Sequence, residues 1–280
     1  MPVPIRVKES NRYGRLEPAR LSAFERALGS ALPPAFREHL LAHNGGRIEG
    51  AREVRYGFGL HDHVSTSLRL PGEYGGLLPS HMLPVAESQG GDLFCLSLAD
   101  RDRGAVFLWD HEGGGEGAGN FHLVAQDFDA FLRGLAISAA LELQQNEIVE
   151  AAVAELGIDA VVLSGKTMLD MALRCEEASH ALIERLVSAG ARISPDGLIE
   201  AVRVGRLATV QLMVSQGLDV NFALPDTGFT ALMLAASGNA LEIAEYLLRK
   251  GALPGMKNIW SKTAAELAHT PQMRELLNGR

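Results

Sequence analysis

The 280-residue sequence predicts an α+β domain, with a mixed, mostly antiparallel sheet and flanking helices, followed by an all-α array of repeated helix pairs. Short apolar runs broken by glycine fill the first half, whereas the second half is rich in alanine and leucine at helical period. Glycine and alanine also recur there about every 30 residues. We therefore expect an N-terminal domain over 1–138, a connecting helix and degenerate first repeat over 139–163, and repeats over 164–280.

The N-terminal half begins with two expected helices. Apolar residues recur at helical spacing from Leu21 to Leu28, and Gly29 then permits the left-handed conformation that ends a helix. The second helix is expected over 35–43 and ends at Asn44.

Five strands are expected next, because short apolar runs are separated by glycine turns. Their ranges are Val54–Gly59, Met82–Ala86, Leu93–Leu98, Ala105–Trp109 and Phe121–Ala125. A last amphipathic helix begins at Asp127. Helices, then strands, then a helix are the order of an α+β domain.

The second half contains an internal repeat with a readable register. Its helix-ending glycines are Gly157, Gly190, Gly217 and Gly251. Small alanines that let helices approach closely stand at Ala172, Ala201, Ala235 and Ala268. Threonines suited to helix N-caps stand at Thr167, Thr230 and Thr263. The apolar faces of such helices are buried only against the neighbouring repeat.

This pattern resembles the ankyrin repeat. Residues 226–236 (DTGFTALMLAA) and 243–252 (IAEYLLRKGA) carry the resemblance most clearly. Further copies cover 165–191 and 197–221, and a partial copy begins at Ser261. The connection from Gly190 to Leu198 is shorter than the family pattern, so we expect its hairpin finger to be largely missing. The resulting gap would make room for a partner or for the first domain.

The N-terminal half resembles the SUKH superfamily, which includes the fungal cell-wall assembly regulators (Smi/Knr type) and many bacterial immunity proteins. The resemblance rests on four stretches in order, which are 24–46, 83–96, 106–111 and 127–132. It implies a binding role, because bacterial members are commonly immunity proteins that neutralise a toxin from the same locus. Ankyrin proteins also occur as immunity proteins in such systems.

Charge and composition narrow the possible partners. The formal net charge of −8 argues against nucleic-acid binding, which needs a basic surface. An acidic surface attracts a basic partner, although the same charge also serves solubility alone. No apolar stretch long enough for a membrane helix and no signal peptide are visible. Cys95 and Cys175 lack metal-type spacing, so we expect a reduced cytoplasmic protein.

The sequence offers little catalytic chemistry, so no enzyme activity, cofactor or metal is expected. His61-Asp62-His63 is the most metal-like cluster, because alternate residues of a strand share a face. No third ligand follows at a telling distance, and a solvated loop is the favoured interpretation over a metal-dependent enzyme. The glycine-rich stretch 113–119 lacks the strand–helix context of a phosphate-binding loop and predicts a hairpin loop.

Candidate partner-binding residues occur in both halves. In the first half, Glu87, Asp92 and Asp110 would supply charge to a binding cleft, although bonding of Asp92 to local backbone amides is the favoured interpretation. Glu25, Asn44 and Cys95 are expected to serve the fold. On the repeats, the finger and inner-helix positions are Arg203, Val204, Phe229, Ser237, Ile259 and Trp260. Trp260 is either an interface anchor or a cover for the edge of the last repeat.

Together, these features predict a cytoplasmic immunity protein (antitoxin) that binds and neutralises a cognate toxin encoded beside it. A basic nuclease toxin would suit the acidic charge. The alternative is a regulatory adaptor that binds a host-cell protein through its ankyrin surface.

Overall fold

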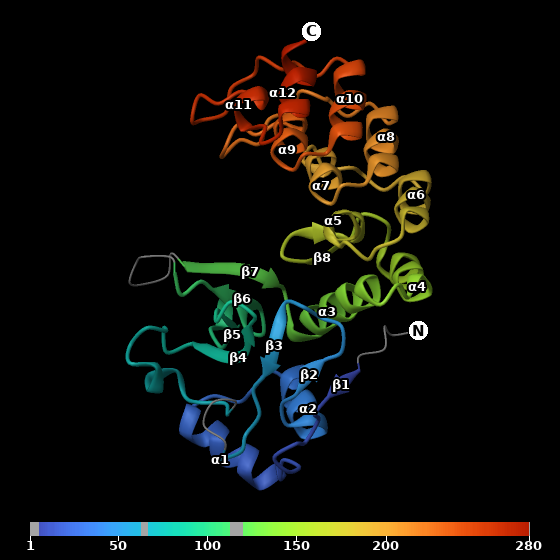
Figure 1. Ribbon diagram of the computed structural model, residues 1–280. Helices are drawn as coiled ribbons and strands as arrows, with labels where there is room; N and C mark the ends of the chain where they lie inside the picture. Colours follow the sequence, from blue (N-terminus) through green and yellow to red (C-terminus); the bar gives the residue numbers. More distant parts are fainter. Residues whose placement is uncertain (1–5, 63–66, 113–119, 280) are drawn as a thin grey trace. The chain divides into compact units, whose positions relative to one another are not determined.

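The computed structural model describes residues 6–62, 67–112 and 120–279, and the chain divides into two compact units, 1–168 and 169–280. The elements of the first unit are β1 (Val7–Lys8), α1 (Pro18–Leu28), α2 (Pro34–His43), β2 (Arg47–Ile48), β3 (Val54–Gly57), η2 (Pro71–Tyr74), β4 (Met82–Ser88), β5 (Leu93–Ser97), η3 (Asp100–Asp102), β6 (Val106–Trp109), β7 (Phe121–Ala125), α3 (Phe128–Glu142), α4 (Asn146–Leu156), β8 (Val161–Leu163) and β9 (Lys166–Thr167). Figure 1 shows these elements in chain order.

The sheet of the first unit has the order β3-β4-β5-β6-β7, and every pairing between neighbouring strands in it is antiparallel. The five predicted strands are confirmed, with ends that differ by two residues at most. The two-residue strands β1 and β2, which pair with each other, were not predicted because so short a segment shows no periodicity.

The two faces of the sheet pack differently because successive side chains alternate. On one face, Phe94 packs against Phe131 of α3, with ring centroids 5.2 Å apart. On the other face, buried Cys95 packs with Leu78 and Met82, while several partly buried side chains surround them. These are Tyr74, Leu93, Phe107, Trp109 and Phe121. The first face therefore forms the main core, and the second keeps an aromatic border that is partly open to solvent.

Asp127, where the sequence predicted the helix to start, is the N-cap of α3, and its carboxylate accepts a hydrogen bond from the Ala130 amide at 2.7 Å. The β8–β9 hairpin packs very closely on this helix. A Cβ atom added at Gly134 would lie 2.8 Å from Leu163 Cδ1 and 2.9 Å from the Val162 carbonyl oxygen. Glycine at this position is what allows the helix and hairpin to touch.

Asn44 serves the fold, as predicted. It adopts a left-handed conformation (φ 44°) at the end of α2. Its side-chain oxygen accepts from the Leu60 amide at 2.7 Å, and its Nδ2 donates to the Gly14 carbonyl at 2.8 Å. Glu25 likewise accepts a hydrogen bond from the Leu32 amide, which fixes the connection between α1 and α2.

The second unit is a stack of helix pairs. Its elements are α5 (Met168–Arg174, whose first residue is the last of the first unit), α6 (His180–Ser188), α7 (Gly197–Arg203), α8 (Leu207–Ser215), α9 (Ala231–Ser237), α10 (Leu241–Arg249), α11 (Ala264–Leu267) and α12 (Pro271–Asn278). The repeat alanines are at most 2% exposed, and the four glycines expected to end helices all have positive φ. Thr230 and Thr263 cap α9 and α11 through their hydroxyl groups, as the sequence predicted.

The finger before α7 is missing, as the short spacing predicted. Residues 189–196 connect α6 to α7 without a strand or bridge among the described residues. Between α8 and α9, by contrast, Ala223 and Thr230 form an antiparallel bridge, and the Leu224 amide donates to the Phe229 carbonyl at 2.9 Å. The short connection is instead held by Ser194, whose hydroxyl donates to Asp170 at 2.8 Å.

Candidate partner-binding surfaces

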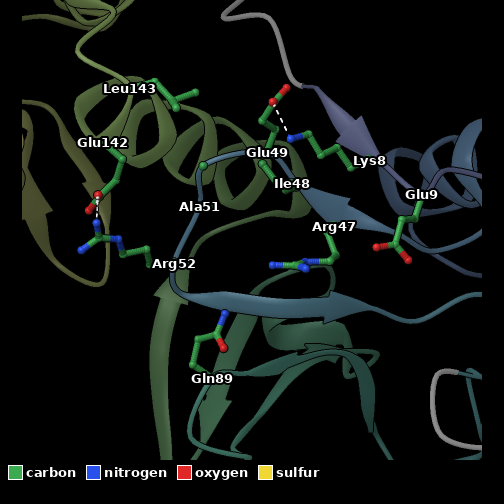
Figure 2. A pocket seen from close by; sticks show the side chains of 11 residues that line it. Lys8, Glu9, Arg47, Ile48, Glu49, Ala51, Arg52, Gln89, Glu142 and Leu143 are labelled. Carbon is green, nitrogen blue, oxygen red and sulfur yellow. Dashed lines mark ion pairs between the residues drawn. The ribbon is translucent and has the colours of Figure 1, made fainter.

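Two cavities of about 380 and 410 Å³ open beside β1, β2, β3 and β4 of the first unit. They are neighbours, since Glu9, Arg47 and Gln89 line both. Figure 2 shows the first of them, with the Arg47 side chain extending into the space between β2 and β3. No local pattern in the sequence indicates these cavities, because their walls come from segments far apart in the chain.

The cavity walls carry several ion pairs. Lys8 pairs with Glu49 at 2.7 Å, and Arg52 pairs with Glu142 at 2.8 Å (Figure 2). Glu87 belongs to this site, because its carboxylate pairs with Arg55 at 3.1 Å. The structure thus places Glu87 in a charged cavity wall.

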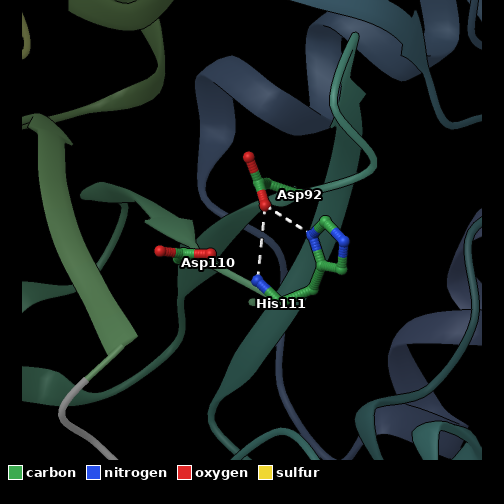
Figure 3. Close-up of side chains that lie close together, drawn as sticks. All are labelled: Asp92, Asp110 and His111. Atoms are coloured by element: carbon green, nitrogen blue, oxygen red, sulfur yellow. Dashed lines mark hydrogen bonds and ion pairs between the residues drawn. The ribbon is translucent and has the colours of Figure 1, made fainter. Parts of the chain in front are cut away.

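Asp92 and Asp110 do come together, and His111 joins them at the ends of β5 and β6 (Figure 3). One ligand atom from each of the three residues lies within 4.8 Å of the others. The Asp92 Oδ1 accepts from the His111 ring at 2.7 Å and from its backbone amide at 3.3 Å. Asp92 also accepts from the Ser88 hydroxyl. The local backbone amides expected to bond Asp92 bond Ser88 instead, because the Ser88 hydroxyl accepts from the Gly90 amide at 3.2 Å and the Asp92 amide at 3.0 Å.

Asp92 and His111 stabilise each other's charged form. Burial alone would raise the pKa of Asp92, but the hydrogen bonds from His111 and Ser88 outweigh it and lower the pKa. The bond to Asp92 raises the pKa of His111. Two carboxylates and an imidazole are also a ligand set that divalent transition metals accept, although the His111 Nδ1 is already bonded to Asp92.

The His61-Asp62-His63 stretch is only partly described, because His63 lies outside the described residues. His61 is 5% exposed, and its ring lies 4.4 Å from that of Tyr13. The Asp62 carboxylate pairs with Arg20 at 2.7 Å. The glycine-rich stretch 113–119 also lies outside the described residues. Cys95 is fully buried, as expected, and burial raises the pKa of its thiol.

In the second unit, Phe229, Ile259 and Trp260 form a fingertip surface. The Phe229 and Trp260 rings are 6.0 Å apart, edge to face. Ile259 and Trp260 are each 60% exposed, so the contact with Phe229 leaves most of the indole open to solvent. Adjacent fingers are joined, because the Ile259 amide donates to the Thr227 carbonyl at 3.1 Å.

The inner-helix candidates lie at helix ends. Arg203 is the last residue of α7 and Val204 follows it, while Ser237 ends α9 and donates to the Leu234 carbonyl. Glu200, which was not among the predicted contact residues, is 5% exposed and joins two arginines in this region. It pairs with Arg174 at 2.8 Å and with Arg203 at 3.0 Å. An acidic residue on a buried helix face was the signal that could have identified it.

Each of the two units contains a stretch that matches the model of a known protein family. The model of the SMI1/KNR4 family (SUKH-1) matches residues 15–134, and the ankyrin-repeat model, in three copies, matches residues 175–258. These matches confirm the predicted arrangement of a SUKH-type domain before ankyrin repeats. None of the described helices is long and apolar enough to cross a membrane.

Curated relatives match the chain over limited stretches. "Ankyrin repeat and SAM domain-containing protein 6" of Danio rerio is 32% identical over 98 residues, which is 35% of this chain and 13% of the relative. "B-cell lymphoma 3 protein homolog" of Mus musculus is 33% identical over 121 residues, which is 41% of this chain and 27% of the relative. The chain thus spans little more than a quarter of these relatives at most.

Proposed function

We propose that this chain, in which a SUKH-type domain precedes ankyrin repeats, is a cytoplasmic immunity protein that neutralises a toxin by binding it directly. Ankyrin repeats mediate protein binding, and the SUKH family is immunity-protein-like. The main support for a binding function, as opposed to a catalytic one, is the exposed fingertip surface of Phe229, Ile259 and Trp260.

The fingertip surface is suited to binding because it is both exposed and rigid. The Asn258 side-chain oxygen accepts from the backbone amides of Trp260 at 3.0 Å and Lys262 at 2.9 Å, which fixes the turn. A preorganised loop loses little conformational entropy when a partner docks. Tryptophan is also enriched among the residues that dominate binding energy.

The acidic character of the chain supports a basic partner, such as a nuclease toxin. The net charge is −8, and Asp92 and Asp110 place two carboxylates at one edge of the first unit. Opposite charges on partner and chain would accelerate their encounter, mainly at low ionic strength.

The direct test is co-expression with the toxin encoded by a neighbouring gene. We expect wild-type protein to restore growth and to co-purify with the toxin. The Trp260→Ala variant should bind about thirtyfold more weakly, because truncating an anchor residue costs about 2 kcal/mol or more. Leu253→Ala is the matched control, since Leu253 is 57% exposed on the same unit and lies outside the fingertip surface.

Two outcomes would contradict the proposal. One is a toxin that still kills and forms no complex with the wild-type protein. The other is equal binding by the wild type and Trp260→Ala, which would remove the fingertip surface from the interface. The regulatory-adaptor alternative would be favoured by two results together. The gene would have no toxin gene beside it, and the wild-type protein would bind a host-cell protein that the Trp260→Ala variant does not bind.

A further inference from the structure

We propose that the two neighbouring cavities around Arg47 are a binding site for a polar ligand that carries a single carboxylate group. This site lies in the first unit, does not depend on the proposed immunity function, and involves none of the fingertip residues. Its central feature is the solvent-exposed guanidinium group of Arg47, which lines both cavities and has no ion pair or hydrogen bond within the part of the chain that the structure describes.

The backbone fixes where Arg47 lies. Asn44, Gly45 and Gly46 have φ angles of 44°, 86° and 132°, so three successive residues adopt conformations that side chains seldom allow. A Cβ atom on Gly46 would lie 2.7 Å from the Lys8 carbonyl oxygen, which shows how tightly this turn packs on β1. Arg47 then pairs with Lys8 in the β1–β2 ladder. The base of its side chain is therefore preorganised.

The charges in the walls leave Arg47 without compensation. Each of the other cations that line the cavities has an acidic partner that also lines them. These pairs are Lys8–Glu49, Arg12–Glu9, Arg52–Glu142 and Arg55–Glu87. Only the guanidinium of Arg47 remains, so the site carries one uncompensated positive charge on a protein whose net charge is −8.

One uncompensated cation selects a ligand with one negative charge. The planar guanidinium donates two parallel hydrogen bonds to a carboxylate, which adds geometric selectivity to the charge attraction. A phosphate group carries close to two negative charges, which is more than the single positive charge of Arg47 can neutralise. Its excess negative charge would also be repelled by the four carboxylates in the cavity walls. A carboxylate therefore suits the site better than a phosphate.

The remaining walls favour a polar ligand. Tyr13, Tyr56 and Gln89 line the second cavity and offer hydroxyl and amide groups. Each cavity has a volume within the range of about 300–1,000 Å³ that is usual for small-molecule sites. The carboxylate could belong to a free metabolite or to the C-terminus of a peptide, and these two sources share the same chemistry.

The test is an NMR titration of the full-length protein with ¹⁵N-labelled arginine side chains. The probes are N-acetylglycine, its neutral analogue N-acetylglycinamide, acetyl-triglycine and inorganic phosphate. We expect both carboxylate probes to shift the Arg47 Nε signal and the amide to leave it unchanged. Tighter binding of acetyl-triglycine would identify a peptide C-terminus as the source, and tighter binding of N-acetylglycine would identify a small molecule.

Variants connect the signal to Arg47. Arg47→Gln should weaken carboxylate binding about tenfold or more, as expected for a lost hydrogen bond to a charged group. Arg47→Lys should bind with intermediate affinity, because it keeps the charge but loses the planar fork. Arg26→Gln, which alters an exposed arginine on α1 outside the cavities, should bind like the wild type.

The proposal is overturned if neither carboxylate shifts the Arg47 signal at millimolar concentration, or if the neutral amide shifts it equally. Tighter binding of phosphate than of carboxylate would overturn the assigned ligand class. Unchanged affinity in Arg47→Gln, with circular dichroism showing a folded protein, would overturn the role of Arg47. None of these outcomes bears on toxin binding through the fingertip surface.

Discussion

His39 gives the first unit a pH-dependent stability that can be measured directly. This residue lies on α2, where its ring is 4.9 Å from the His43 ring and 5.4 Å from the Phe128 ring. Burial, assisted by the nearby His43, lowers the pKa of His39 from 6.5 to about 4. The folded protein therefore holds this imidazole in its neutral form.

The magnitude follows from linkage between protonation and folding. Because the folded pKa lies below the unfolded one, the contribution of His39 is fully present above pH 6.5 and is lost as the pH falls toward about 4. Each pH unit corresponds to about 1.4 kcal/mol, so the free energy of unfolding should fall by about 3 kcal/mol across this window. Burial also lowers the pKa of His43, which adds a loss of the same sign.

The assay is urea denaturation of the wild type and His39→Phe at a series of pH values from about 4 to 7. Phenylalanine keeps an aromatic ring beside Phe128 but cannot be protonated, so its curve should lack most of the loss below pH 6.5. His122→Phe is the matched control, because His122 is exposed on β7. Parallel pH profiles for the wild type and His39→Phe would refute the reasoning.

Two further predictions concern close packing and a buried polar side chain. Gly134→Ala should lower the free energy of unfolding by about 1–3 kcal/mol, because the new methyl group would overlap Leu163 and the Val162 carbonyl. Urea denaturation would measure this loss. An unchanged urea midpoint would contradict the close contact between α3 and β8. Asn44→Ala should cost about 2–3 kcal/mol, because it leaves the buried Leu60 amide without its acceptor and places alanine at positive φ. Thermal unfolding would measure this loss of stability. Asn44→Gly should lose less stability than Asn44→Ala, because glycine tolerates a positive φ. Equal losses in the two variants would exclude the backbone contribution.

The sequence by itself determined the elements and the register of the repeats. Helix-ending glycines such as Gly217 and capping threonines such as Thr230 act on their own neighbourhood, so their spacing along the chain records their role directly. The five sheet strands were similarly visible, because apolar runs and glycine turns are local signals. Trp260 could be placed at a fingertip for the same reason, since its position follows from the repeat register.

Only the tertiary structure decided which charged side chains meet. Glu87 and Asp92 are close in sequence, yet the first pairs with Arg55 and the second with His111. Arg47 stands out only because the other cations around it have acidic partners contributed by separate segments. Such pairings depend on how strands cross and on side-chain rotamers, and no periodicity in the sequence records either. The repeats could therefore be predicted from local rules, whereas the cavity around Arg47 could be recognised only after the chain was folded.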